Sequence, residues 1–129
     1  MQLAALRNTF VFDLWFYESG SGSGNMEIVL EDLPTGTGPT RCVGVYTLCN
    51  PTSYTVSTEI PSCVATLAAR SAGWHHLTVS IDRTASTARY CVDAACHTEA
   101  SFAFPVDEFW INGGGLDVYI DDVTITALP

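Results

Sequence analysis

The segment at residues 10–17 alternates side chains so that both faces of an extended strand are largely apolar. Even positions carry Phe10, Phe12, Leu14 and Phe16, and odd positions carry Val11, Asp13, Trp15 and Tyr17. Because successive side chains of a strand point to opposite sides, this pattern predicts a central strand that buries one face in a core. The second face is then either covered by loops or open as a platform for a ligand.

Further short apolar segments predict strands and no amphipathic helix. The clearest follows Trp74, where His75, Leu77, Val79 and Ile81 share one face. Residues 64–70 fit a strand or one helical turn, and we favour the strand. The expected strands are 10–17, 26–30, 41–48, 54–59, 64–70, 74–82, 89–92, 101–104, 108–111 and 116–126, with turns at 83–86 and 113–115. Strands at this spacing predict an all-β, two-sheet antiparallel sandwich of the jelly-roll type.

The last predicted strand changes phase in its middle. Leu116, Val118 and Ile120 share one parity, whereas Val123 and Ile125 share the other. A β-bulge at Asp121 and Asp122 reconciles the two halves and aims both carboxylates together. Such a pair suits a structural calcium ion, and it suits a solvated edge equally well.

Five cysteines predict disulfide bonds. A two-residue turn at Asp93 and Ala94 places Cys91 directly opposite Cys96, at a separation that a disulfide spans. Cys42, Cys49 and Cys63 leave one pair and one odd thiol, and sequence alone does not choose among the pairings. We favour Cys49 with Cys63. Because no Cys-x-x-Cys pair is present, zinc is the weaker use of these thiols, and the chain is expected in an extracellular or periplasmic setting.

Composition narrows the partners. The 129 residues suit a single domain spanning residues 1–129, with 47% hydrophobic and 15% charged residues. A net charge of −9 disfavours nucleic acid, anionic membranes and polyanionic glycans, leaving neutral ligands, cations or another protein. No apolar run is long enough to insert into a membrane, and the opening residues are too short and too soon charged for a signal peptide.

Three segments together resemble the laminin-G-like branch of the concanavalin-like lectin and glucanase superfamily. They read Phe-Val-Phe-Asp-Leu-Trp-Phe-Tyr at 10–17, Arg-Ser-Ala-Gly-Trp-His-His-Leu at 70–77 and Tyr-Ile-Asp-Asp-Val-Thr-Ile-Thr at 119–126. The resemblance implies a curved jelly roll that holds a ligand, often a sugar, on its concave sheet or edge loops. It also raises the expectation of calcium. Such domains usually have strands before the first segment, where this chain has nine residues, so the resemblance implies an exposed strand edge or self-association.

The candidate ligand site is centred on Trp15 and Tyr17. Aromatic planes stack on the C–H faces of sugars, and carboxylates such as Asp13 and Glu27 accept hydroxyl protons. Trp110 has the parity to extend the same platform. The alternative is that these rings form a second small core.

The neighbouring histidines are predicted to differ in role. His75 shares its parity with the apolar residues that follow, which indicates a hydrogen-bonded core histidine. His76 faces the other way and joins the candidate ligand residues, although an ordinary polar surface role is the alternative. We expect Trp74 to anchor the start of this strand in the core.

Catalysis is disfavoured by the carboxylate spacing. Glu27 and Glu31 share one strand face but are about 13 Å apart, beyond the separation used by either glycosidase mechanism. No Gly-x-Ser-x-Gly motif is present. The sequence therefore predicts a non-catalytic, lectin-like module for a neutral glycan. The alternative is a structural or adhesive domain that self-associates, for example as a homodimer, or binds another protein through an exposed edge, and a glycosidase or lyase is a weaker third.

Overall fold

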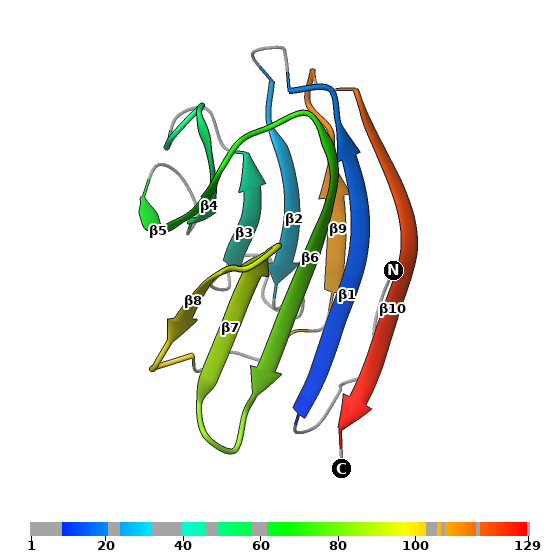
Figure 1. The fold of residues 1–129 in the computed structure, drawn as a ribbon. Helices are drawn as coiled ribbons and strands as arrows, with labels where there is room; N and C mark the ends of the chain where they lie inside the picture. The colour runs from blue at the N-terminus through cyan, green and yellow to red at the C-terminus, as the bar shows by residue number, and fades with distance from the viewer. Residues whose placement is uncertain are drawn as a thin grey trace.

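A computed structural model describes residues 9–20, 24–31, 40–45, 49–57, 62–102, 106, 108–115 and 117–128. Within these ranges the chain forms two antiparallel five-stranded sheets and no α-helix (Figure 1). The first sheet has the order β10-β1-β6-β7-β8, and the second has the order β5-β4-β3-β2-β9. The strands are β1 (Thr9–Glu18), β2 (Met26–Glu31), β3 (Thr40–Val45), β4 (Ser53–Ser57), β5 (Cys63–Ala69), β6 (Gly73–Asp82), β7 (Thr87–Val92), β8 (Ala95–Glu99), β9 (Glu108–Asn112) and β10 (Val118–Leu128). The predicted all-β sandwich is confirmed.

Strand β1 lies inside the first sheet, as its alternating pattern predicts. It pairs with β10 on one side and with β6 on the other. Its even-numbered side chains from Phe10 to Phe16 are buried, and Trp15 on the opposite face is exposed. The outer face of β1 is therefore open at Trp15.

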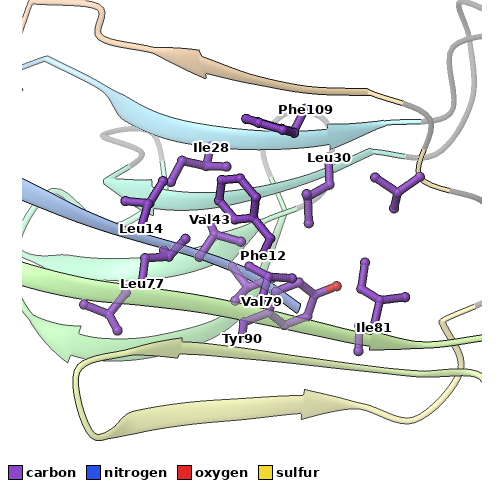
Figure 2. Close-up of a cluster of buried hydrophobic side chains, with 14 of the residues drawn as sticks. Phe12, Leu14, Ile28, Leu30, Val43, Leu77, Val79, Ile81, Tyr90 and Phe109 are labelled. Carbon is purple, nitrogen blue, oxygen red and sulfur yellow. The ribbon is translucent and has the colours of Figure 1, made fainter. Parts of the chain in front are cut away.

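The core lies between the two sheets and is built from the inward side chains of both (Figure 2). Phe12 and Leu14 of β1 and Leu77 and Val79 of β6 come from the first sheet. The second sheet contributes Ile28, Leu30, Val43 and Phe109. Phe12 and Phe109 are in ring contact across the interface, with centroids 4.5 Å apart. Burial of these apolar side chains is the main stabilising contribution to the sandwich.

The predicted bulge in β10 is confirmed. Asp13 lies opposite Thr124 and Trp15 lies opposite Asp121, so β10 has one residue more than β1 in this stretch. Asp122 takes the extra position with a φ of +49°. The bulge lets Ile120 and Ile125 both face inward, because an additional residue shifts the alternation by one.

The predicted hairpin disulfide is also present. Val92 pairs with Ala95, and Cys91 is bonded to Cys96 with Cα atoms 4.1 Å apart. Asp93 adopts the left-handed conformation that this tight turn needs. The favoured pairing of Cys49 with Cys63 is confirmed, with Cα atoms 5.6 Å apart. Cys42 belongs to β3, but its side chain lies outside the described residues.

Two ion pairs, one buried and one partly buried, lie between the sheets at opposite ends of the sandwich. Glu18 of β1 pairs with Arg70, and Glu99 of β8 pairs with Arg41 of β3. A tyrosine hydroxyl completes each pair, since Tyr54 of β4 donates to Glu18 over 2.8 Å and Tyr90 of β7 donates to Glu99 over 3.0 Å. Burial raises the pKa of both tyrosines, and the nearby carboxylates raise it further.

Some predicted boundaries are wrong or lie outside the described residues. Residues 101–104 are not a strand where they are described, because Ser101 is in a turn and Phe102 has no regular structure. The backbone N–H of Phe102 donates to the Ser86 carbonyl over 2.9 Å, which replaces a ladder bond. Residues 46–48, 58–59, 103–104 and 116 lie outside the described part. Residues 63–69 are a strand, as favoured, and 95–99 form a further strand. In the described ranges there is no helix of the length and hydrophobicity needed to cross a membrane.

Candidate functional site

An open cluster of aromatic side chains covers the outer side of β10, β1 and β6. We call it the aromatic face, and it consists of Trp15, Tyr17, Trp74, His76 and Tyr119. The antiparallel register builds it, because Trp15 lies opposite His76 and Tyr17 lies opposite both Trp74 and Tyr119. All five side chains project from the side of the sheet away from the core.

The aromatic face has two rows. Tyr17 lies between Trp74 and Tyr119. Its ring centroid is 5.7 Å from that of Trp74 and 6.1 Å from that of Tyr119, and both contacts are edge-on. Two residues along β1, Trp15 stacks on His76 with centroids 4.7 Å apart and an angle of 19° between the planes. The exposed fractions are 40% for Trp15, 51% for Trp74 and 65% for Tyr119. These rings contact one another yet present free faces to solvent, so they do not form a second core.

Asp13 holds His76 in position. Nε2 of His76 donates to one Asp13 oxygen over 2.7 Å, and the hydroxyl of Thr78 donates to the other over 3.0 Å. The carboxylate therefore lies beside Trp15, as predicted, but it already accepts two protein hydrogen bonds. Its first effect is to fix the imidazole ring on which Trp15 stacks, and any ligand hydroxyl must share an oxygen that is in use.

A shallow hollow lies beside the rings, where β10 bulges away from β1. It has a volume of about 200 Å³ and is lined by Trp15, Trp74, Asp121 and Asp122. Asp121 accepts a hydrogen bond of 2.9 Å from the backbone N–H of Asp122. The bulge thus brings two carboxylates to the same hollow as two indole rings.

His75 lies on the core side of the same strand and confirms the predicted core role. It is 6% exposed, its Nδ1 lies 2.8 Å from an Asp93 oxygen, and its Nε2 lies 2.9 Å from the Ser71 carbonyl. The second Asp93 oxygen accepts from the backbone N–H of His76 over 2.9 Å. Partial burial raises the pKa of Asp93, but the hydrogen bonds from both histidines outweigh burial and leave the pKa below its usual value.

The structure does not bring Trp110 and Glu27 to this site. Trp110 lies on β9, opposite Val29 of β2, and therefore belongs to the second sheet, whereas Trp15 belongs to the first. Both indole rings are exposed, but on different sheets. Glu27 lies on β2 and is buried. The predicted extension of one platform from Trp15 to Trp110 is therefore wrong, because an outward parity does not specify which of the two outer faces a residue shares.

Trp74 corrects another expectation. It was expected to anchor the core, yet it is the most exposed of the three tryptophans. Strand β6 alternates regularly, so Trp74 shares the outward side with His76, while His75 and Leu77 point inward. The parity that identified His76 as outward already contained this information.

Sequence reasoning missed two further features. Tyr119 belongs to the aromatic face, and its parity opposite to Val118 and Ile120 is the signal that could have found it. The buried Glu18 was also missed, although it continues the inward series of even positions in β1. Its partner Arg70 carries no local signal for the pairing, because the two residues are 52 positions apart.

The described residues contain no group of three or more histidine, cysteine, aspartate or glutamate side chains arranged to hold a metal ion. At the bulge only Asp121 and Asp122 come together, and both are exposed. A calcium ion prefers six to eight oxygen ligands. Calcium at this pair therefore stays a prediction from the sequence.

Comparison of the sequence with protein-family models and with curated proteins finds no match. Function must therefore be argued from the site itself.

Proposed function

We propose that this protein is a non-catalytic carbohydrate-binding module that holds a glycan on its aromatic face. The observation that carries the proposal is the set of partly exposed rings on three adjacent strands, led by Trp15, Trp74 and Tyr119. Large apolar side chains gathered in one exposed patch are typical of recognition surfaces. Stacking on the C–H face of a pyranose is the interaction that such a surface favours.

The spacing of the rings suits a short stretch of sugar. Neighbouring strands are about 4.8 Å apart, so the row formed by β10, β1 and β6 spans roughly 10 Å. The second row, at Trp15, lies about 7 Å further along β1. This area accommodates one or two pyranose rings, with Trp74 and Trp15 offering the largest stacking surfaces.

Charge disfavours an anionic glycan. Asp13, Asp121 and Asp122 lie on or beside the aromatic face, and the whole chain has a net charge of −9. Uronate or sulfate groups would therefore be repelled at short range. The proposed ligand therefore stays a neutral glycan, and Trp74 and Tyr119 take the places of Trp110 and Glu27 as proposed binding residues.

The compartment follows from the disulfides as part of this proposal. Two disulfides, Cys49–Cys63 and Cys91–Cys96, persist in oxidising surroundings. These surroundings are extracellular or periplasmic, and glycans are present in both compartments. The resemblance of three segments to laminin-G-like domains agrees with this setting and with a binding rather than a catalytic role.

Affinity electrophoresis through gels that contain neutral polysaccharides, followed by titration of any ligand found, tests the proposal. Trp15→Ala is expected to weaken binding by about tenfold or more, because one stacked aromatic ring contributes on the order of 1 kcal/mol beyond burial. Trp110→Ala is a matched control, since Trp110 has the same 40% exposure on the other sheet. Equal effects of the two substitutions, or no retardation by any glycan at high protein concentration, would contradict the proposal.

A second candidate function is self-association through β10. Among the described strands β10 pairs only with β1, so its 11 residues form one edge of the first sheet. Val123 and Leu128 of this strand are each 43% exposed. A long apolar edge strand favours antiparallel pairing with the same strand of a second copy.

A further inference from the structure

We infer that the sugar held on the aromatic face carries a free amino group, and that its ammonium lies in the hollow lined by Trp15, Trp74, Asp121 and Asp122. The inference rests on the proposed carbohydrate-binding function and replaces the neutral glycan by a cationic one, an amino sugar.

Four carboxylates of the described residues have an arginine or histidine partner. Glu18 pairs with Arg70 and Glu99 pairs with Arg41, both between the sheets. On the outer side and at the hairpin, Asp13 pairs with His76 and Asp93 pairs with His75. In each case a positive or proton-donating side chain faces the carboxylate.

Asp121 and Asp122 differ from these four carboxylates. Over the described ranges neither forms an ion pair, and Asp121 accepts a hydrogen bond from the backbone N–H of Asp122. The chain contains no lysine and five arginines, of which Arg41 and Arg70 already pair with Glu99 and Glu18. Two adjacent, solvent-exposed carboxylates beside the hollow are therefore open to a cation from outside.

The walls of the hollow indicate which cation fits. Two indole rings line it together with the carboxylates, and both are about half-exposed. Indole faces attract ammonium groups through the cation–π interaction, whereas a calcium ion needs six to eight oxygen ligands. A cation with hydrocarbon around it satisfies both the rings and the carboxylates.

The position of the hollow points to a sugar amine. It shares Trp15 and Trp74 with the aromatic face, so a pyranose stacked on either ring brings its substituents to the rim of the hollow. A protonated amino substituent at the rim forms an ion pair with the carboxylates of Asp121 and Asp122. An N-acetyl group at the same carbon is neutral and bulkier, so it gains neither the ion pair nor the full cation–π contact.

The test compares three oligosaccharide series of equal length by calorimetric titration at about pH 6, where an amine of ordinary pKa is protonated. The series are glucosamine, N-acetylglucosamine and glucose oligomers. We expect the glucosamine series to bind about tenfold more tightly than the other two series, because one exposed ion pair together with a cation–π contact supplies an affinity gain of this size. The affinity ratio between the amine and N-acetyl series is the measured quantity.

Asp121→Asn with Asp122→Asn is expected to bring this ratio close to one. Asp117→Asn removes a charge from the same region of the chain, at the residue before β10, and is expected to leave the ratio unchanged. Equal loss in both variants would show that the overall negative charge, and not the hollow, selects the amine, which overturns the inference.

The remaining outcomes separate this inference from the proposed function. Equal binding of all three series overturns the amine assignment and leaves carbohydrate binding standing. Binding of none of them, and of no neutral polysaccharide, overturns carbohydrate binding itself. One further result also overturns the amine assignment, namely choline alone binding more tightly than the glucosamine oligomers.

Discussion

Replacing Glu18 by glutamine is expected to destabilise the fold more than any surface substitution. The Glu18 side chain is fully buried, it forms an ion pair with Arg70, and it accepts a hydrogen bond of 2.8 Å from Tyr54. Glutamine keeps the shape but removes the charge. The Arg70 guanidinium, whose side chain is 9% exposed, then remains between the sheets without this carboxylate.

The magnitude follows from burial. Removing one member of a buried ion pair typically costs about 3–5 kcal/mol, because the remaining charge has lost water and gains no counterion. We take about 3 kcal/mol, since the Arg70 side chain keeps some contact with solvent. For a domain of this size that corresponds to a decrease in Tm of roughly 10 °C.

Thermal and urea unfolding followed by circular dichroism, with the disulfides kept oxidised, measures the loss. Tyr54→Phe alone should cost about 1–2 kcal/mol, the usual effect of a hydrogen bond to a charged group. Together with Glu18→Gln it should cost less than the sum, because both substitutions act on the same hydrogen bond. Asp117→Asn, an exposed carboxylate, should change stability by less than about 0.5 kcal/mol. A cost below about 1 kcal/mol for Glu18→Gln would refute the reasoning that this pair joins the two sheets.

Two further predictions concern pH and self-association. The hydrogen bond from Arg41 lowers the pKa of Glu99 below its usual value, so the stability from this pair is fully present above the pKa of the unfolded chain and is lost as the pH falls through the lowered pKa. Between about pH 5 and pH 3, the free energy of unfolding should therefore fall less steeply with pH in Glu99→Gln than in the parent protein. Parallel plots of this free energy against pH would contradict a stabilising role of the Arg41–Glu99 pair. If β10 pairs with a second copy, sedimentation velocity should show a dimer that Val123→Lys converts to monomer, while Val64→Lys on the edge strand β5 leaves it intact. A monomeric parent protein at all concentrations would exclude this pairing.

Local alternation was enough to predict much of the fold. The period of two in β1 and β6 identified the inward side chains, including the hydrogen-bonded His75, because a strand's own geometry decides which residues share a side. The bulge at Asp121 and Asp122 followed from a change of phase within one strand. The bond between Cys91 and Cys96 followed from the geometry of a two-residue turn. All of these features depend on residues close together in the chain.

The tertiary structure decided which strands are neighbours, and with it the composition of the site. Parity correctly placed Trp15 and Trp110 on outward faces, but strand order put them on different sheets. Tyr119 and Trp74 meet Tyr17 only because β10 and β6 both pair with β1. Glu18 finds Arg70 across 52 residues for the same reason. The alternation of side chains is a property of each strand alone, whereas pairing depends on the free energy of the whole sandwich, which no local segment of sequence contains.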